Sequence, residues 1–321
     1  MTSESRARAN WVSRYLRETH FKPPATNTLT FGAELELLAF DARTNTVAPI
    51  FPVADGECTL DVVRDVAHRL AWRETLSDKG VPRFSSASGS SLTFEPGGQL
   101  EYASAVHGSV DAVLRELCTV ESQLREGADA RGIALLTVGV DPFNAAEDAP
   151  LQLTADRYAR MARYFAAIGP DGARMMRQTA SLQINIGGVH PIERWAVANA
   201  MAPWLVAMFA NSSRYAGADS GSASFRADTW RGVDPGRTGL FRGTDALAEY
   251  TTFALDARAF LADDAAPCFV DLEAPLVTDA TLATHLTTLF PEVRPRGYLE
   301  LRSLDALADD GRRAAMALVA G

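Results

Sequence analysis

The stretch FGAELELLAF, residues 31–40, places Glu34 and Glu36 two positions apart in a segment that otherwise has the composition of a buried β-strand. Side chains alternate between the two faces of a strand, so both glutamates point to one face and the neighbouring leucines point to the other. Two carboxylates side by side on a half-buried face repel each other and need a cationic partner. The alternative is a partly exposed strand end that leaves both glutamates in water.

The composition is that of a globular protein with a large core. The chain has 321 residues, of which 47% are hydrophobic and 22% are charged. Its net charge of −9 and the lack of a basic block argue against nucleic acid as a partner. The three cysteines are far apart and form no CxxC pair, which fits a reducing compartment. We therefore expect a cytoplasmic protein.

Two segments need to be distinguished from targeting or membrane sequences. Residues 1–24 have charges throughout and no apolar centre, so they are expected to form an amphipathic helix ended by Pro23 and Pro24, not a secretory signal. Residues 195–213 carry no charge, but they are rich in alanine and include Asn199 and Pro203. This composition favours a buried helix over a membrane span, and no membrane partner is expected.

Hydrophobic periodicity predicts alternating helices and strands. The expected helices are residues 60–77, 106–129, 155–168 and 309–319. The expected strands are residues 90–104, with a turn at Pro96-Gly97-Gly98, and residues 133–140, 179–188 and 297–306. Residues 210–239 are rich in glycine, serine and arginine, and their length is typical of a functional loop.

Four of the predicted strands, in residues 31–40, 90–104, 179–188 and 297–306, share one design, with one apolar face and one polar face. The polar faces carry Glu34, Glu36, Glu95, Gln99, Glu101, Gln183, Asn185, Glu300 and Arg302. We expect an α+β fold whose sheet is covered by helices on one side and open on its polar side. Because the polar residues extend over most of the chain, residues 1–321 are expected to form a single catalytic domain. Residues 1–24 would be an N-terminal helical extension and residues 306–321 a short C-terminal helix.

The polar faces indicate metal-dependent chemistry. The glutamates that would share one concave surface are Glu34, Glu36, Glu95, Glu101 and Glu300. Ligands made only of oxygen select Mg²⁺, with Mn²⁺ also possible, over zinc. The sequence has no GxxxxGK[ST] loop, GxSxG elbow or HExxH motif. Arginines beside such metals point to phosphoryl transfer, in which catalysis is mostly positioning and charge neutralisation.

Several motifs, taken together, resemble a known family. They are GAELE, EPGGQLE, MMRQTASLQIN, SGSASFRADTW, DPGRTG and YLELR. In this order they are similar, over about residues 30–305, to glutamate–cysteine ligases of the plant and actinobacterial type, which include the enzyme that starts ergothioneine biosynthesis. The resemblance implies a glutamine-synthetase-like catalytic domain with a curved, mainly antiparallel sheet. It also implies that ATP phosphorylates the γ-carboxylate of glutamate and that cysteine attacks the γ-glutamyl phosphate to form γ-glutamylcysteine, a precursor in glutathione or ergothioneine biosynthesis.

The resemblance also implies roles for individual residues. Mg²⁺ would be held by Glu34, Glu36, Glu95, Glu101 and Glu300. Gln183 and Asn185 would line the metal and the ATP phosphates, and Arg302 would neutralise the transferred phosphoryl group beside Glu300. The residues expected to bind substrates are Gln99, Arg226, Trp230 and Arg237. The alternative role for Arg226 and Arg237 is to fix the loop through salt bridges. The alternative for Trp230 is packing in the core, and the alternative for Glu101 is orientation of Gln99.

Other functions remain open at this stage. A ligase of the same kind could join glutamate or another acid to an amine other than cysteine. A guanidino kinase of the same broad fold would phosphorylate and stop, and a non-catalytic relative would bind amino acids or nucleotide as a sensor. The expected partners are small molecules, namely ATP, glutamate and cysteine or another amine, in a monomer or homodimer.

Overall fold

One antiparallel sheet forms the centre of the protein. The computed structural model describes residues 3–54, 56–76, 80–259 and 267–321. Within these ranges the strands of the sheet are β1 (Thr30–Asp41), β2 (Arg73–Leu76), β3 (Pro82–Ser85), β4 (Ser91–Phe94), β5 (Leu100–Ala103), β6 (Ile133–Leu136), β7 (Ser181–Gly187), β10 (Val293–Pro295) and β11 (Leu299–Asp305). Their order is β10-β11-β7-β1-β5-β4-β3-β2, with β6 paired to β1, and these pairings are antiparallel. The α+β class with a mainly antiparallel sheet is confirmed.

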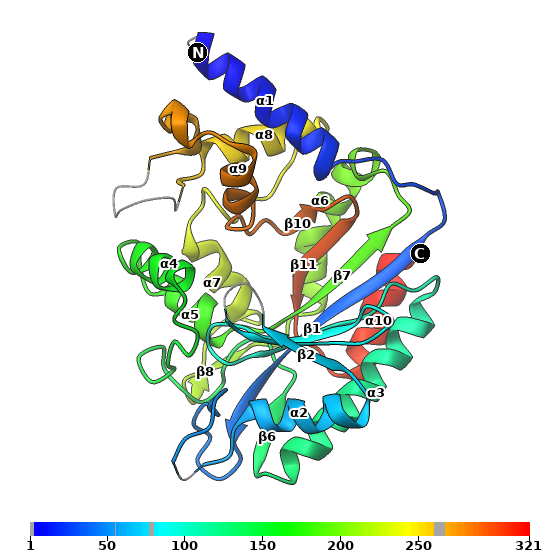
Figure 1. Ribbon diagram of the computed structural model, residues 1–321, viewed down its shortest axis with the longest axis vertical. Helices are drawn as coiled ribbons and strands as arrows, with labels where there is room; N and C mark the ends of the chain where they lie inside the picture. The colour runs from blue at the N-terminus through cyan, green and yellow to red at the C-terminus, as the bar shows by residue number, and fades with distance from the viewer. Residues whose placement is uncertain (1–2, 55, 77–79, 260–266) are drawn as a thin grey trace.

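Helices border both faces of this sheet. They are α1 (Ser3–Thr19), α2 (Thr59–Arg69), α3 (Val110–Asp129), α4 (Asp156–Ala166), α5 (Asp171–Gln178), α6 (Pro191–Met208), α7 (Phe225–Val233), α8 (Ala246–Asp256), α9 (Asp279–Leu286) and α10 (Asp309–Ala320). α3 packs on β1 and β6, α6 on β11 and α10 on β7, and the main hydrophobic core lies between these helices and the sheet (Figure 1). The polar face of the sheet stays accessible as the floor of a cleft, and side chains of α4, α5, α7 and α9 border that cleft.

The strand register brings the polar side chains together. Glu36 lies opposite Glu101 in the β1–β5 pair, and Glu34 lies opposite Gln183 in the β1–β7 pair. Side chains directly opposite in an antiparallel pair share a face and have Cβ atoms about 5 Å apart. The alternation read from the sequence therefore becomes a continuous polar surface across β11, β7, β1 and β5.

The largest departure from the predicted elements follows α2. The sequence predicts one helix over residues 60–77, but α2 ends at Arg69 and β2 follows it. Ala71 has a left-handed backbone with φ 53°, and the amide of Trp72 donates to the carbonyl of Ala67 at 2.8 Å, so the chain turns there. Pairing of β2 with β3 outweighs the local helical pattern. The last residue of the predicted helix lies outside the described residues.

Other boundaries differ by less. α1 ends at Thr19, before Pro23 and Pro24, and its first two predicted residues lie outside the described ranges. α3 begins at Val110 because the Oγ of Ser109 accepts a hydrogen bond from the Ala112 amide at 3.3 Å. The predicted loop of residues 210–239 contains the two-stranded hairpin β8 (Arg214–Tyr215) and β9 (Ala218–Asp219) as well as α7.

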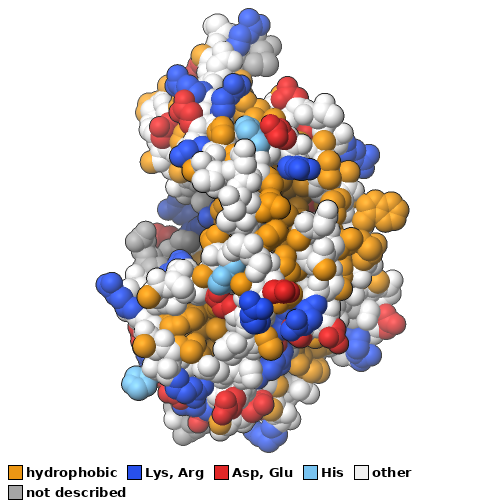
Figure 2. All heavy atoms as spheres, turned by 90° about the vertical axis from the view of Figure 1, so that its right-hand side faces the viewer, with side chains coloured by type: hydrophobic (Ala, Val, Ile, Leu, Met, Phe, Trp, Pro, Cys, Tyr) orange, Lys and Arg blue, Asp and Glu red, His pale blue; other side chains and the backbone are white. Residues whose placement is uncertain are grey.

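Residues 195–208 of the uncharged segment belong to α6, which is buried on one side only. Trp195, Ala202 and Leu205 lie in the core, whereas Val197 and Trp204 are exposed by 55% and 69%. Figure 2 shows hydrophobic side chains gathered on the middle of the face at the right of Figure 1. No helix in the described part of the chain combines the length and the hydropathy that a bilayer span needs.

The EPGGQ motif forms the predicted turn between β4 and β5. The amide of Gly98 donates to the carbonyl of Glu95 at 2.9 Å, and Gly98 has a positive φ of 100°. A side chain at Gly97 would collide with the backbone of Arg177. Both glycines are thus required, one for the turn and one for a close approach of two segments. The turn fixes Glu95 and Glu101 on neighbouring strand ends.

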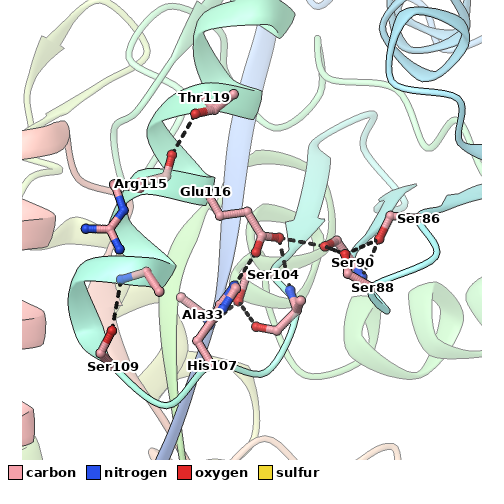
Figure 3. A network of polar contacts seen from close by, with 12 residues as sticks. Ala33, Ser86, Ser88, Ser90, Ser104, His107, Ser109, Arg115, Glu116 and Thr119 are labelled. Atoms are coloured by element: carbon pink, nitrogen blue, oxygen red, sulfur yellow. Dashed lines mark hydrogen bonds and ion pairs between the residues drawn. The ribbon is translucent and has the colours of Figure 1, made fainter.

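A carboxylate on α3 ties the helix layer to the underside of β5. Glu116 accepts hydrogen bonds from the Ser90 hydroxyl at 2.6 Å, the Ala105 amide at 3.0 Å, the Tyr102 hydroxyl and the His107 ring. Figure 3 shows Glu116 pointing toward Ser90 and His107. Because Tyr102 and Glu101 point to opposite faces, this contact below the sheet supports the cleft above it.

Glu116→Gln is expected to lower the free energy of unfolding by about 2 kcal/mol at neutral pH. Burial raises the pKa of Glu116, but the Ser90, Tyr102 and His107 donors outweigh burial and hold this pKa below its ordinary value of 4.5. A depressed folded-state pKa stabilises the protein above pH 4.5, and this stabilisation is lost as the pH falls through the folded-state value. Chemical denaturation of both proteins as a function of pH measures the difference. A gap that stays constant below pH 4.5 would contradict the role of the charge.

Candidate active site

A cleft of about 590 Å³ lies over the polar face of the sheet. The residues predicted from the sequence that line it are Glu34, Glu36, Glu95, Gln99, Glu101, Gln183, Arg226, Trp230 and Arg302. Three other predicted residues, Asn185, Arg237 and Glu300, are not among its lining residues. The cleft therefore combines side chains from the central strands with side chains from the helices that border them.

The carboxylates on the floor of the cleft perturb one another. Burial and the charge of Glu36 raise the pKa of Glu95 to about 7. Burial and the charges of Glu95, Glu34 and Glu36 raise the pKa of Glu101 well above its ordinary value. The pKa of Glu34 is also raised, first by burial and then by the nearby Glu300. Acids arranged in this way are stabilised by a cation.

The floor of the cleft offers the carboxylate oxygens of Glu34, Glu36, Glu95 and Glu101. Oxygen donors of this kind fit Mg²⁺. Within the described residues, however, no three acidic, histidine or cysteine side chains are close enough together to form a complete metal site. Mg²⁺ commonly keeps waters and substrate phosphates in its shell, so it needs only one or two protein carboxylates at a time. The metal site predicted from five glutamates stays a prediction.

A chain of hydrogen bonds connects the acidic floor to an arginine. The carboxylate of Glu36 accepts from the Ser181 amide at 2.7 Å and from Nε2 of Gln183 at 3.1 Å. Oε1 of Gln183 in turn accepts from Nη1 of Arg302. The side-chain amide of Gln183 therefore has both ends engaged, and it holds Arg302 at a defined position beside Glu36.

Glu300 is predicted to bind a metal ion, and its partners in the structure are arginines. Nε and Nη2 of Arg294 bind both carboxylate oxygens, with Nη2 at 3.0 Å, while Arg302 and Arg296 approach to 3.3 Å and 3.5 Å. Burial raises the pKa of Glu300, but the Arg294 and Arg302 guanidiniums outweigh it and lower the pKa to about 2. Glu300 is fully buried, and arginines engage its carboxylate in this structure, so its assignment as a metal ligand stays a prediction.

Arg226 and Trp230 lie on the α7 wall of the cleft. Nη2 of Arg226 donates to the backbone carbonyl of Arg302 at 2.9 Å, and its guanidinium lies over the Trp230 ring with 5.1 Å to the ring centroid. Nε1 of Trp230 donates to the carbonyl of Phe290 at 2.9 Å. Both residues line the cleft and also support Arg302, so the structure adds a positioning role to the predicted substrate contacts.

Two residues predicted to bind substrate, Arg237 and Gln99, form hydrogen bonds with other parts of the protein. Arg237 is fully buried, donates to the hydroxyl and the carbonyl of Thr288 at 2.9 Å and 3.1 Å, and pairs with Asp234 at 3.1 Å. It fixes the loop, and its prediction as an anion-binding residue finds no place in this cleft. The amide of Gln99 donates to the Thr179 carbonyl and accepts from the Gly97 amide, both at 3.0 Å, so Gln99 ties the turn to the start of β7.

Asn185 holds a carboxylate from behind the cleft. Its Nδ2 donates to Glu34 at 3.3 Å, and it lies opposite Glu300 in the β7–β11 pair. Asn185 does not line the cleft, so direct contact with nucleotide phosphates finds no support in this position. The strand period places it on the correct face but does not tell how deep on that face the side chain lies.

Several lining residues escaped the sequence analysis. Arg83, Arg157, Arg294 and Arg296 line the cleft, as do Tyr15 and His20 from the N-terminal region. The sequence VRPRGYLELR contains a usable signal, because its first two arginines recur with the two-residue period of a strand. Nothing in the local sequence distinguishes Arg157 from the other arginines of α4.

Comparisons with known proteins match most of the chain to one family. The sequence model of glutamate-cysteine ligase family 2 (GCS2) matches residues 30–321. Glutamate–cysteine ligase EgtA of Mycolicibacterium smegmatis is 34% identical over 244 residues, which cover 69% of this chain and 57% of that protein. The chloroplastic glutamate–cysteine ligase of Arabidopsis thaliana is 28% identical over 300 residues, which cover 85% of this chain and 55% of that protein.

A solved structure shows a similar fold. The crystal structure of glutamate–cysteine ligase from Francisella tularensis in complex with AMP superposes with a TM-score of 0.52 at 13% identity, covering 90% of this chain and 66% of that chain. At this identity the likeness concerns the fold alone. The chain spans somewhat more than half the length of the curated relatives it matches. The match over residues 30–321 nevertheless includes every strand of the sheet and all the cleft helices except α1, and the chain belongs to glutamate-cysteine ligase family 2.

Proposed function

We propose that this chain, acting as one catalytic unit of the glutamine-synthetase-like type, joins glutamate to cysteine in an ATP- and Mg²⁺-dependent reaction. The observation that supports this most strongly is the contact between the acidic floor and Arg302. Glu36 binds Gln183, Gln183 binds Arg302, and all three line one cleft. A site for phosphoryl transfer needs oxygen ligands for a metal beside a fixed cation, and this arrangement provides both.

The proposed reaction has two steps. An oxygen of the glutamate γ-carboxylate attacks the γ-phosphorus of ATP, and the bond to ADP breaks. The ammonium group of cysteine loses a proton to solvent, and the resulting amine attacks the carbonyl carbon of the γ-glutamyl phosphate. Phosphate leaves with the bonding electron pair, and the nitrogen releases a second proton as the amide forms. Bound Mg²⁺ would neutralise the ATP phosphates, held by Glu34, Glu36, Glu95 and Glu101. Arg302 stabilises the phosphoryl group as it transfers.

The residues around Arg302 keep it in place. Glu300 and Gln183 accept from its guanidinium, and Arg226 binds its backbone carbonyl. A preorganised cation does not have to move when charge develops in the transition state, which is the source of its catalytic effect. We propose that Arg226 combines this support with recognition of a substrate carboxylate.

The test is ADP release by purified protein with ATP, Mg²⁺ and glutamate, measured with and without each of a panel of amines. The proposal predicts release that depends on cysteine and a product with the mass of γ-glutamylcysteine. A product with another amine would assign the chain to a different carboxylate–amine ligation. A stable phosphorylated product without any amine would indicate a kinase, and binding without turnover would indicate a sensor.

Arg226→Lys is expected to raise the KM of an amino-acid substrate at least about tenfold and to leave the KM of ATP nearly unchanged. Lysine keeps the charge but cannot bind the Arg302 carbonyl and a carboxylate with the planar fork of a guanidinium. Steady-state kinetics with each substrate varied in turn provides the measurement. An unchanged amino-acid KM together with a lower melting temperature would leave Arg226 with a purely structural role.

A further inference from the structure

The N-terminal helix contributes to the cleft although it lies outside the region matched to the family, which starts at residue 30. Nη1 of Arg8 donates to the carbonyls of Phe269 and Val270 at 3.2 Å and 2.6 Å, and Nε1 of Trp11 donates to Asp279 at 3.1 Å. Figure 1 shows α1 lying across α8 at one end of the molecule. This docking brings Tyr15 and His20 to the wall of the cleft.

The hydrogen bonds around His20 determine which ring nitrogen can accept. The Thr19 hydroxyl donates its single hydrogen to the carbonyl of Tyr15 at 2.6 Å. Its 2.8 Å contact with Nδ1 of His20 therefore requires an Nδ1–H donor, which leaves Nε2 as an acceptor. Burial, Arg296 and Arg294 lower the pKa of His20 to about 4, so the ring is neutral at neutral pH.

A cation with spare donors lies beside this ring. The amide of Gly297 donates to the carbonyl of His20 at 2.7 Å, which holds residues 294–298 against the end of α1. Within the described residues, the Arg296 guanidinium has one hydrogen-bond partner, Glu300 at 3.5 Å, and about half of its side-chain surface is exposed. Arg294, in contrast, is committed to Glu300 through two nitrogens. His20 and Arg296 both line the cleft.

We propose that His20 and Arg296 form a subsite for the α-amino and α-carboxylate groups of glutamate at the α1 end of the cleft. Arg296 pairs with the α-carboxylate, and Nε2 of His20 accepts a hydrogen bond from the α-ammonium group. A neutral acceptor among arginines is suited to this task, because it binds a protonated amine without adding positive charge.

The chemistry of the reaction selects glutamate over the amine acceptor. This argument rests on the proposed function, in which glutamate reacts through its γ-carboxylate and keeps its α-ammonium group intact. The acceptor must lose a proton from its amine before it attacks, so a subsite that holds an ammonium group would inhibit it. His20, from outside the matched region, and Arg296, from inside it, would thus together recognise the part of glutamate that does not react.

The test compares glutamate with N-acetylglutamate, in which the ammonium group is replaced by a neutral amide. Equilibrium binding is measured by calorimetry without ATP, and KM values are measured by turnover. Wild type should bind glutamate at least tenfold more tightly than N-acetylglutamate. His20→Phe should lose this preference and keep the ATP KM and the melting temperature. His20→Gln, whose amide can still accept, should retain much of the preference, and His68→Phe at an exposed position of α2 serves as the matched control.

The possible outcomes separate the subsite from the proposed reaction. A preference for glutamate that persists in His20→Phe, or a wild type that binds both compounds equally or binds neither, would overturn the subsite even if ligation is observed. A preference that depends on His20, in a protein that forms no γ-glutamyl product, would support the subsite and refute the reaction. Arg296→Gln should weaken the binding of glutamate and of N-acetylglutamate equally, since both carry the α-carboxylate. An unchanged affinity for both compounds would remove Arg296 from the subsite.

Discussion

Arg302→Ala should lower kcat at least about 10²-fold, or roughly 3 kcal/mol of transition-state stabilisation, while raising the KM of ATP much less. Arg302 borders the cleft, and its guanidinium is held by Gln183 and Glu300 beside the carboxylate of Glu36. Its charge has its largest effect as the phosphoryl group leaves ADP, because negative charge is redistributed at that moment. An interaction made mainly in the transition state changes kcat more than KM.

The variant should fold, because Glu300 keeps two cationic partners. Arg294 binds both of its carboxylate oxygens, and Arg296 lies 3.5 Å away. Melting temperature and kcat are therefore measured on the same preparation, with Arg313→Ala on the exposed side of α10 as the matched arginine control. Well-folded protein with a kcat near that of the wild type would refute the catalytic role of Arg302. A fall in melting temperature with unchanged turnover per folded molecule would assign it to stability.

Glu101→Gln should have opposite effects on activity and on the stability of the metal-free protein. Without a cation, Glu101 is surrounded by Glu95, Glu34 and Glu36, and burial adds to their repulsion. An amide of the same shape removes an acid whose ionisation is disfavoured in the folded state, so the melting temperature without metal should rise. The same change removes a proposed metal ligand, and kcat should fall at least about 10²-fold.

The measurement is thermal unfolding with and without Mg²⁺, combined with turnover. Wild type should be stabilised by Mg²⁺, since a ligand that binds only the folded state raises its apparent stability. Glu101→Gln should lose most of that increase. Glu126→Gln at an exposed position of α3 is the matched control and should keep it. Equal Mg²⁺-dependent stabilisation of wild type and Glu101→Gln would exclude Glu101 as a ligand, whatever happens to kcat.

The sequence predicted the cleft floor because strand periodicity is local. Alternation in residues 31–40 and 179–188 was sufficient to assign Glu34, Glu36 and Gln183 to polar faces, and all three line the cleft. The EPGGQ turn was equally readable, since Gly98 adopts a positive φ that only glycine accepts easily. Local information failed at residues 60–77, where pairing with β3 converts a helical pattern into β2.

The amino-acid sequence by itself determined which residue types share a face and which family the chain resembles. Only the tertiary structure decided the partners of each charge. Glu300 and Arg237 carry the residue types of a metal ligand and an anion site, yet Glu300 is held by Arg294 and Arg237 by Thr288 and Asp234. The placement of α1 against the cleft wall was likewise invisible in the sequence. The physical reason is that periodicity records the direction of a side chain relative to its own backbone, whereas electrostatic and hydrogen-bond partners come from segments that only folding brings together.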